Sequence, residues 1–188
     1  MRIAQISDIH GKPGGKSLGA LEQALDWLKV VEPDALIVSG DVGNPGWDES
    51  YPIVADMLSH VRYPMLIVPG NVDDRAALRA NFRDIGWAAT GPLNVSRTVG
   101  EVRLVGLDVT VPGAMHGDAA PVLDWLREEL TAGEPVLLFM HQHPFRTGFA
   151  NVDKAPCQNA EALADVILAA PARVLLLSTG HGHRTVFT

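Results

Sequence analysis

Short apolar runs alternate with segments of helical periodicity along most of the chain. Most of these runs are continuously apolar, which is typical of strands that are covered on both faces. They predict strands at residues 3–6, 35–38, 65–68, 102–107, 136–140 and 174–177. The strand pattern is therefore that of a buried sheet rather than of a surface hairpin.

Between the apolar runs, leucines recur at helical spacing. Leu18, Leu21, Leu25 and Leu28 fall on one face of a helix, and residues 122–130 repeat the pattern. Further helices are expected at residues 51–59, 75–82 and 160–169. Strands that alternate with helices indicate the α/β class. No repeat, low-complexity tract or linker divides the chain, so residues 1–188 are predicted to form a single domain.

Composition excludes several classes of protein. Of the 188 residues, 47% are hydrophobic and 20% are charged, a balance that argues against disorder. The formal net charge is -7 and no run of Lys or Arg is present, so a nucleic-acid polymer is not an expected partner. The first apolar stretch is too short for a signal peptide or a membrane span, which predicts a cytoplasmic protein with no membrane partner.

The chain has a single cysteine, Cys157, and so cannot form an intrachain disulfide bond. Nothing near Cys157 in the sequence resembles an activating site for a thiolate. We therefore interpret it as a packing or loop thiol rather than as a nucleophile.

Polar residues with metal-binding side chains gather where the predicted strands end. Ligands of open α/β sheets bind beyond the carboxyl ends of the strands, so these residues are expected on one rim. The set consists of Asp8, His10, Asp41, Asn71, His141, His181 and His183.

Taken singly, each of these residues has an ordinary alternative explanation. A strand-terminal Asp can cap the next turn, and Asn71 follows Pro69-Gly70, where an Asn tolerates a left-handed backbone. His141 alone could be a hydrogen-bonded, half-buried imidazole. The pair His181 and His183 is a stronger signal, because residues i and i+2 of an extended segment point the same way.

The combination is more specific than its parts. Carboxylate, imidazole and one amide oxygen form the mixed ligand set that suits Zn, Mn and Fe. A carboxylate can also bridge two ions, and a pair roughly 3.5–4 Å apart can clamp a phosphate and hold a hydroxide for in-line attack on phosphorus. The sequence therefore predicts two divalent or transition-metal ions and a phosphoester hydrolase, with the identity of the metals left open.

The ordered motifs resemble those of the calcineurin-like metallophosphoesterases. The resemblance rests on Asp8-Ile-His10, Gly40-Asp41, Gly70-Asn71, His141 and Gly180-His181-Gly-His183. Residues 107–113 and 141–148 are similar to the bacterial class III cyclic nucleotide phosphodiesterases and the related glycerophosphodiesterases, so the resemblance covers nearly the whole chain.

The resemblance implies a fold and a role for each ligand. The implied fold is an α/β sandwich of two mixed β-sheets flanked by helices, shortened at its carboxyl end. Asp8, His10 and His183 would hold one metal ion and Asn71, His141 and His181 the other, with Asp41 bridging the two. Asp41 and Asn71 would thus lie at the centre of catalysis.

Four further residues are assigned around this centre. Asp73 and Asp74 are expected to support or cap the Asn71 loop rather than to bind metal. His143 and His116 are candidates for contact with the substrate, each with an ordinary packed or loop histidine as the alternative.

The sequence departs from the family pattern in three places. Val72 stands where the family usually has a histidine that assists the departing oxygen, and such help is worth roughly 10²–10⁴-fold. Gly182 replaces a more usual valine and loosens the backbone that aims His181 and His183. The chain stops at Thr188, where relatives of this type continue, which predicts an uncovered strand edge. Either a natural minimal form covers that edge as a homodimer, which is the favoured expectation, or the chain is truncated.

The leading function is hydrolysis of small phosphodiesters such as cyclic nucleotides or glycerophosphodiesters. A phosphomonoesterase uses the same metal core, and a non-catalytic metal-binding scaffold is the alternative from another class. The loops at residues 43–47 and 112–118 are expected to set specificity, and the physiological substrate stays open.

Overall fold

The computed structural model describes residues 1–183. Its first sheet has the strand order β1-β2-β3 and is parallel throughout, with Ile3 paired to Ala35 and Leu36 to Met65. The strands are β1 (Ile3–Ile6), β2 (Ala35–Ser39) and β3 (Met65–Val68). Parallel neighbours need crossover connections. Here α1 (Lys16–Val31) and α2 (Ser50–Leu58) provide them.

The second sheet has the order β4-β5-β7-β9 and is mixed. Its strands are β4 (Val95–Val99), β5 (Val102–Leu107), β7 (Val136–Met140) and β9 (Val174–Thr179). Strands β4 and β5 form an antiparallel hairpin, in which Gly100 has a φ of 58°, and the other pairs are parallel.

The remaining elements are short. Helix α3 (Arg75–Asn81) follows β3, and α4 (Leu123–Glu129) and α5 (Ala160–Ala169) precede β7 and β9. Strands β6 (Gly117–Asp118) and β8 (Cys157–Gln158) pair as a separate parallel ribbon. Two 3₁₀ turns cover Ala120–Val122 and Val152–Lys154.

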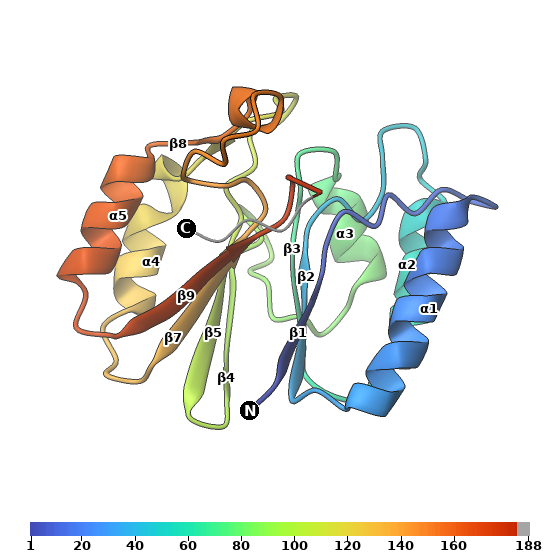
Figure 1. Ribbon diagram of the computed structural model, residues 1–188, viewed down its shortest axis with the longest axis horizontal. Coiled ribbons are helices and arrows are strands. Elements are labelled where there is room, and N and C mark those ends of the chain that lie inside the picture. The colour runs from blue at the N-terminus through green and yellow to red at the C-terminus, as the bar shows by residue number, and fades with distance from the viewer. Residues whose placement is uncertain (184–188) are drawn as a thin grey trace.

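The two sheets lie side by side with helices outside them, α1 and α2 beside the first and α4 and α5 beside the second (Figure 1). Alternate residues of the second sheet face different cores, as the strand period requires. Leu104 and Phe139 pack into the core that the first sheet shares, whereas Val105 and Leu138 pack under α4 and α5. At Gly106 the sheets approach so closely that a Cβ would lie 2.7 Å from Val68.

The predicted α/β fold with two sheets flanked by helices is confirmed. The finer expectation that both sheets are mixed holds for the four-stranded sheet only, since the first is joined entirely by helical crossovers. All six predicted strands form, whereas β4, β6 and β8 were not predicted. The assignment of residues 1–188 to a single domain stays a prediction.

Strand β9 corrects one expectation. Its apolar run predicted cover on both faces, but Leu175 and Leu176 are 49% and 53% exposed. The reason is its position, because among residues 1–183 β9 lies at the edge of its sheet and pairs with β7 alone. An exposed apolar edge is a site where another chain can pair. The homodimer stays a prediction.

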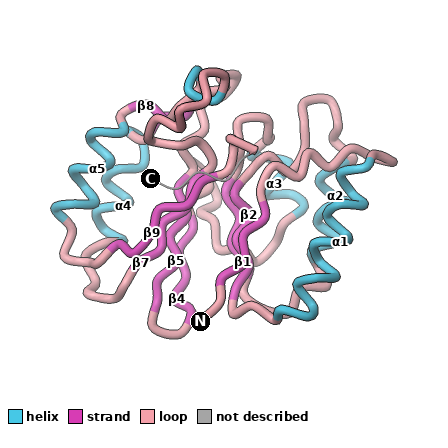
Figure 2. Tube along the Cα trace, viewed as in Figure 1, coloured by secondary structure: helices cyan, strands magenta, loops and turns pink. Residues whose placement is uncertain are grey.

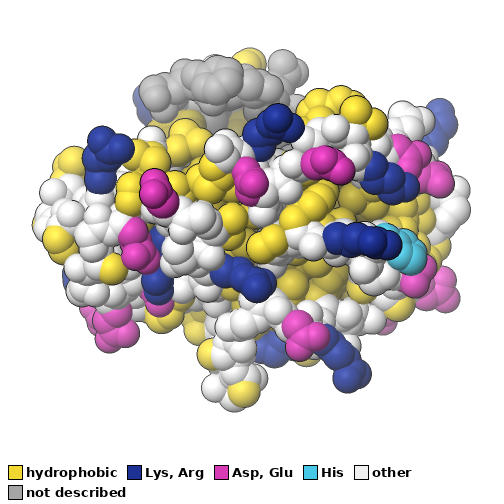
Figure 3. Space-filling view, turned by 90° about the horizontal axis from the view of Figure 1, so that it is seen from below, with side chains coloured by type: hydrophobic (Ala, Val, Ile, Leu, Met, Phe, Trp, Pro, Cys, Tyr) yellow, Lys and Arg dark blue, Asp and Glu magenta, His cyan; other side chains and the backbone are white. Residues whose placement is uncertain are grey.

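The outer surface gives limited information on partners. Within residues 1–183, no helix combines the length and the hydrophobicity needed to cross a bilayer. Figure 3 views the end where the parallel strands begin, and there basic and acidic side chains are interspersed with hydrophobic ones. The coloured part of this face therefore presents no continuous basic patch.

Candidate metal centre

The carboxyl ends of the central strands meet at one edge of the molecule, where loops gather (Figure 2). Asp8 and His10 follow β1, Asp41 follows β2 and Asn71 follows β3. His141 follows β7, and His181 and His183 follow β9. The structure thus brings the seven predicted residues to one rim, from both sheets.

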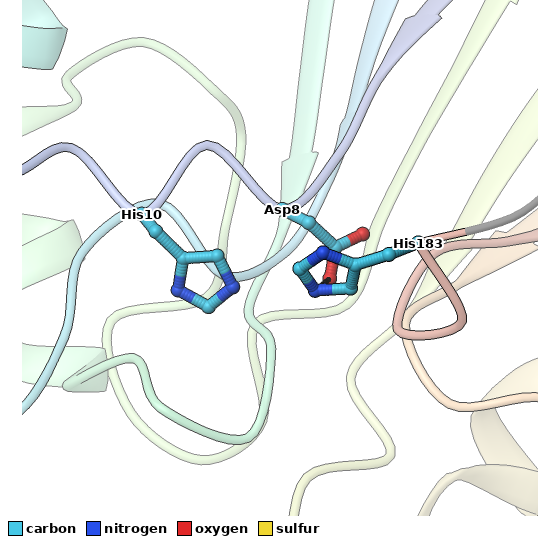
Figure 4. A group of neighbouring side chains, drawn as sticks. All are labelled: Asp8, His10 and His183. Atoms are coloured by element: carbon cyan, nitrogen blue, oxygen red, sulfur yellow. Dashed lines mark ion pairs between the residues drawn. The ribbon is translucent and has the colours of Figure 1, made fainter. Parts of the chain in front are cut away.

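A first group consists of Asp8, His10 and His183. One ligand-capable atom of each lies within 4.8 Å of the others. The side chains point toward one another (Figure 4), with His183 Nε2 at 3.1 Å from Asp8 Oδ1. The rings of His10 and His183 are stacked, with their centroids 5.3 Å apart. His10 Nδ1 donates to Asn44 Oδ1 at 3.3 Å, which leaves Nε2 free to face the group.

A second group consists of Asp41, His141 and His181, again within 4.8 Å. His141 Nδ1 lies 2.7 Å from the carbonyl oxygen of Ser39, so this nitrogen carries a hydrogen and donates it. Nε2 then faces Asp41 Oδ1 at 3.3 Å and Asn71 Oδ1 at 3.2 Å. A ring nitrogen that converges on two oxygens needs a positive charge, either a proton or a metal ion.

Asp41 lies between the two groups. Its Oδ1 faces His141, and its Oδ2 is 3.6 Å from His10 Nε2. Burial raises the pKa of Asp41, but the hydrogen bond and the charge of His141 and the amide of Val72 outweigh it, so the pKa lies below its usual value. The side chain is therefore an ionised carboxylate that reaches both groups.

The imidazoles of the second group differ in their electrostatics. Burial lowers the pKa of His141, but the hydrogen bond and charge of Asp41 more than reverse this, and the pKa is raised overall. Burial, together with the neighbouring His141, lowers the pKa of His181 to about 4. His181 is thus a neutral imidazole at neutral pH, the form that binds a metal ion.

The backbone at this edge is strained. Positive φ angles occur at Asp8 (54°), His10 (44°), Asp41 (53°), His181 (64°) and His183 (47°). Such values are uncommon for residues with a side chain and cost of order 1–3 kcal/mol each. Because these strained residues are concentrated here, we infer that the placement of their side chains determines the local geometry, against the preference of the backbone.

A glycine precedes Asp41, Asn71 and His181, where the strand ends approach one another closely. A Cβ on Gly70 would lie 2.0 Å from Asp41 Oδ1, and one on Gly40 would lie 2.6 Å from His141 Nδ1. A Cβ on Gly180 would lie 2.0 Å from Ser7 Oγ and 3.1 Å from Asp8 Oδ2. Any side chain at these glycines would displace the groups.

Asp73 ties together the loops that carry Asp41 and Asn71. Its carboxylate accepts hydrogen bonds from the backbone amides of Val42, Gly43 and Gly70 at 2.9–3.1 Å. Burial raises the pKa of Asp73 to about 6, against the opposing effect of these amides. Asp74 caps α3 by accepting from Ala77 at 2.8 Å. The predicted supporting and capping roles of this pair are confirmed.

Replacing Asp73 by alanine is expected to lower the free energy of unfolding by roughly 2–4 kcal/mol, because three buried amides lose their charged acceptor. Urea denaturation followed by circular dichroism measures this change. Asp56→Ala, at an exposed position of α2, is the matched control and should change stability by less than about 0.5 kcal/mol. Equal effects of the two substitutions would contradict the role given to Asp73.

The residues present fit a pair of metal ions. Asp8 Oδ1 is buried and accepts no hydrogen bond from residues 1–183. Carboxylates, neutral imidazoles and the Asn71 amide oxygen are the ligands that Zn, Mn and Fe share. The assignment of the seven residues as metal ligands stays a prediction, and the geometry is the one it requires.

The two candidate substrate residues are placed differently. His143 is buried, and its ring stacks on that of His181 with centroids 5.9 Å apart. His116 is half-buried and belongs to neither group. The roles of both in substrate binding stay predictions, although only His143 contacts the centre.

Two contacts of the seven candidate ligands were not predicted from the sequence. Asn44 orients His10, and the sulfur of Met115 accepts a hydrogen bond from Asn71 Nδ2 at 3.4 Å. A polar residue in the loop after a ligand-bearing strand was the available signal for Asn44. Nothing in the pattern around Met115 indicated its contact, because the residues are far apart in the sequence.

A cavity of about 550 Å³ adjoins this centre at Asn71 and Val72. Its walls are the loops at residues 44–48, 70–76 and 110–113. Arg75 lines it, but its guanidinium is held by Asp108 through hydrogen bonds of 2.6 and 2.9 Å. A larger cavity of about 690 Å³ lies between α1 and α2 and contains none of the seven residues, so we associate function with the smaller one.

Comparisons with known proteins agree with this geometry. A model of the calcineurin-like phosphoesterase family matches residues 1–185. The chain is 30% identical over 203 residues to the glycerophosphodiester phosphodiesterase GpdQ of Enterobacter lignolyticus, covering 100% of this chain and 73% of that protein.

Two further relatives extend the comparison. The chain is 27% identical over 196 residues to the 3',5'-cyclic adenosine monophosphate phosphodiesterase CpdA of Escherichia coli, covering 98% of this chain and 70% of that protein. A crystal structure of a dimetal phosphatase from Danio rerio has a TM-score of 0.75 at 16% identity, covering 97% of this chain and 82% of that one. At this identity the structural match supports the fold.

Proposed function

The chain belongs to the calcineurin-like phosphoesterase family, and on that premise we propose that it is a metal-dependent phosphodiesterase acting on small diesters. The observation that carries this proposal is the pair of three-residue groups that Asp41 connects. The proposed substrates are of the cyclic nucleotide or glycerophosphodiester type, in line with the names of the relatives.

Each group would hold one ion. Asp8, His10 and His183 form the first site, and His141, His181 and Asn71 form the second, with Asp41 shared. Two divalent ions, when bound, supply Lewis-acid polarisation of phosphoryl oxygens and a nucleophile that is available at neutral pH. Mn, Fe and Zn all suit these ligands.

The residues of the chain prepare this site in two ways. The Ser39 carbonyl and Asn44 fix the tautomers of His141 and His10, so that Nε2 of each ring faces Asp41. Ionised Asp41 then places a negative charge between the two sites, which favours two cations at close distance. These hydrogen bonds already orient both imidazoles toward Asp41, so binding of the ions requires no rearrangement of the fold.

The adjoining cavity favours diesters over monoesters. A monoester carries a second negative charge on its phosphate, and a free cation beside the site would be needed to bind it. Among the described residues that line the cavity, the cation is Arg75, and Asp108 neutralises it, while Asp48, Asp73 and Asp74 are acidic. A diester with an uncharged alcohol fits this lining better.

Val72 restricts which alcohols can leave readily. It lines the cavity next to Asn71, and its side chain has no hydrogen to donate to a departing oxygen. We therefore expect faster turnover of esters whose alcohols are acidic. The same feature favours the second candidate, a non-catalytic metal-binding scaffold, whereas the complete ligand set favours the enzyme.

Hydrolysis of bis(p-nitrophenyl) phosphate by the Mn²⁺-loaded protein tests the proposal. We expect this diester to be cleaved faster than p-nitrophenyl phosphate, and cleavage to stop when a chelator is added and to return with Mn²⁺. A preference for the monoester would support the phosphomonoesterase instead. Two bound ions without cleavage of either ester would leave the scaffold as the function.

A further inference from the structure

The imidazoles of the two groups are held in different ways. His141 and His10 each use their second ring nitrogen to donate a hydrogen bond, to Ser39 and Asn44. Metal-binding histidines nearly always have such a partner, because it fixes both the ring and its tautomer. Within residues 1–183, no hydrogen bond to the His181 ring is found; the ring lies beside those of His141 and His143 and near the carboxylate of Asp41.

His143 stacks on one face of the His181 ring. The two rings are nearly parallel, with an interplanar angle of 23° and centroids 5.9 Å apart. His143 is 1% exposed and does not line the cavity beside Asn71, so it does not meet the substrate there. Its position suits support of His181 better than contact with a phosphate.

His143 itself is fixed by the segment that follows it. Its carbonyl accepts from the amide of Cys157 at 2.9 Å. Asp153 Oδ1 lies 3.7 Å from His143 Nε2, and its carboxylate also accepts from the amides of Thr147 and Gly148 at 2.7 and 3.1 Å. The loop that carries His143 is therefore held by hydrogen bonds between its own residues.

The chain bears a cost for this imidazole. Both ring nitrogens of His143 are buried and have no hydrogen-bond partner within the described residues. A buried polar atom without a partner is destabilising, and native proteins contain few of them. The stack on His181 requires only a flat ring at this position, which a phenyl ring would also provide.

We propose that His143 is a positioning residue, whose ring holds that of His181 in place for the second metal ion by stacking against it in lieu of a hydrogen bond. This inference rests on the proposed function, since it takes His181 as a ligand. The backbone of His181 has a φ of 64°, and its amide donates to Asp8 Oδ2 at 3.1 Å, so the main chain is fixed while the ring depends on His143.

Titration of the metal-free chain with Mn²⁺ in a calorimeter tests the proposal. In His143→Ala the affinity for the second ion is expected to fall about 10–100-fold, the range for loss of a supporting contact, while the first ion binds as in the wild type. His143→Phe keeps a flat ring and should bind the second ion nearly as the wild type does. His60→Ala, which removes an exposed histidine outside both groups, is the matched control.

A double-mutant cycle with His181→Ala identifies the ion concerned. His143→Ala should weaken binding no further once His181 is absent, because the supported ring is gone. Unchanged affinity in His143→Ala, equal weakening of both ions, or failure of the Phe ring to preserve affinity would each overturn the positioning role. If the wild type binds fewer than two ions, the proposed function itself fails and this inference fails with it.

Discussion

Replacing Asp41 by alanine is expected to lower phosphodiesterase activity by at least about 10³-fold. Metal ions contribute several kcal/mol to the transition state, and each 1.4 kcal/mol is a factor of ten in rate. Asp41 is the residue whose two carboxylate oxygens face His141 and His10, so its loss affects both proposed sites at once. The measurement is kcat on bis(p-nitrophenyl) phosphate, together with the number of Mn²⁺ ions bound per chain.

The control for this substitution is Asp165→Ala on the exposed face of α5, which should leave both quantities unchanged. Asp41→Asn separates charge from shape, because the amide keeps the volume and one oxygen but removes the negative charge. We expect Asn to bind the ions more weakly than Asp does and better than Ala. Full activity with two ions bound to Asp41→Ala would remove the basis of the proposed function.

Replacing Val72 by histidine is expected to raise the rate on diesters with alkoxide leaving groups by about 10²-fold, the lower end of the range for general acid catalysis. Val72 lines the cavity beside Asn71, and its amide already donates to Asp41 Oδ1 at 3.2 Å. The backbone at position 72 is therefore held by Asp41, and a side chain there lies at the cavity. Nitrophenyl diesters, whose alcohols leave without a proton, should gain little.

The comparison requires both classes of ester to be measured on the same preparations. Val72→Phe introduces a ring that cannot donate a proton, and it should give no gain on either class. An equal gain of the histidine variant on both classes would show that substrate binding, rather than protonation of the leaving oxygen, had improved. If the histidine variant shows no gain on diesters with alkoxide leaving groups, the absence of a proton donor at Val72 does not limit their hydrolysis.

The central strands could be predicted because burial on both faces leaves a continuous apolar run, as in β2, whose residues are all buried. Strand β4 was missed because it lies at a sheet edge and reads Val-Ser-Arg-Thr-Val, with most of its side chains in contact with solvent. Strands β6 and β8 are two residues long and leave no periodicity to detect. The apolar run of β9 did not indicate its exposure, because hydrophobicity does not show which strand lies at a sheet edge; the expectation of an uncovered edge came only from the comparison with the family pattern.

The gathering of the seven candidate ligands on one rim could be predicted for a topological reason, since parallel strands direct their carboxyl ends to the same edge. What holds those ligands could not be predicted. The contact of His141 with the Ser39 carbonyl joins residues 102 positions apart, and the stack of His143 on His181 depends on how two loops meet. The positive φ angles are equally hidden, because they occur at residues with side chains, such as Asp8 and Asp41, which the sequence does not distinguish from ordinary strand ends.

The origin of the ligands has a consequence for how the molecule resists heat and proteases. Asp8 and His10 follow a strand of the first sheet, while His183 follows a strand of the second. An ion bound by all three would therefore link the two sheets at the carboxyl ends of their strands. By mass action, each ion present at a hundred times its dissociation constant adds about 2.7 kcal/mol to the folded state. We therefore expect the melting temperature of this chain to rise with the concentration of free metal, and removal of the metal to separate the two sheets at this rim first.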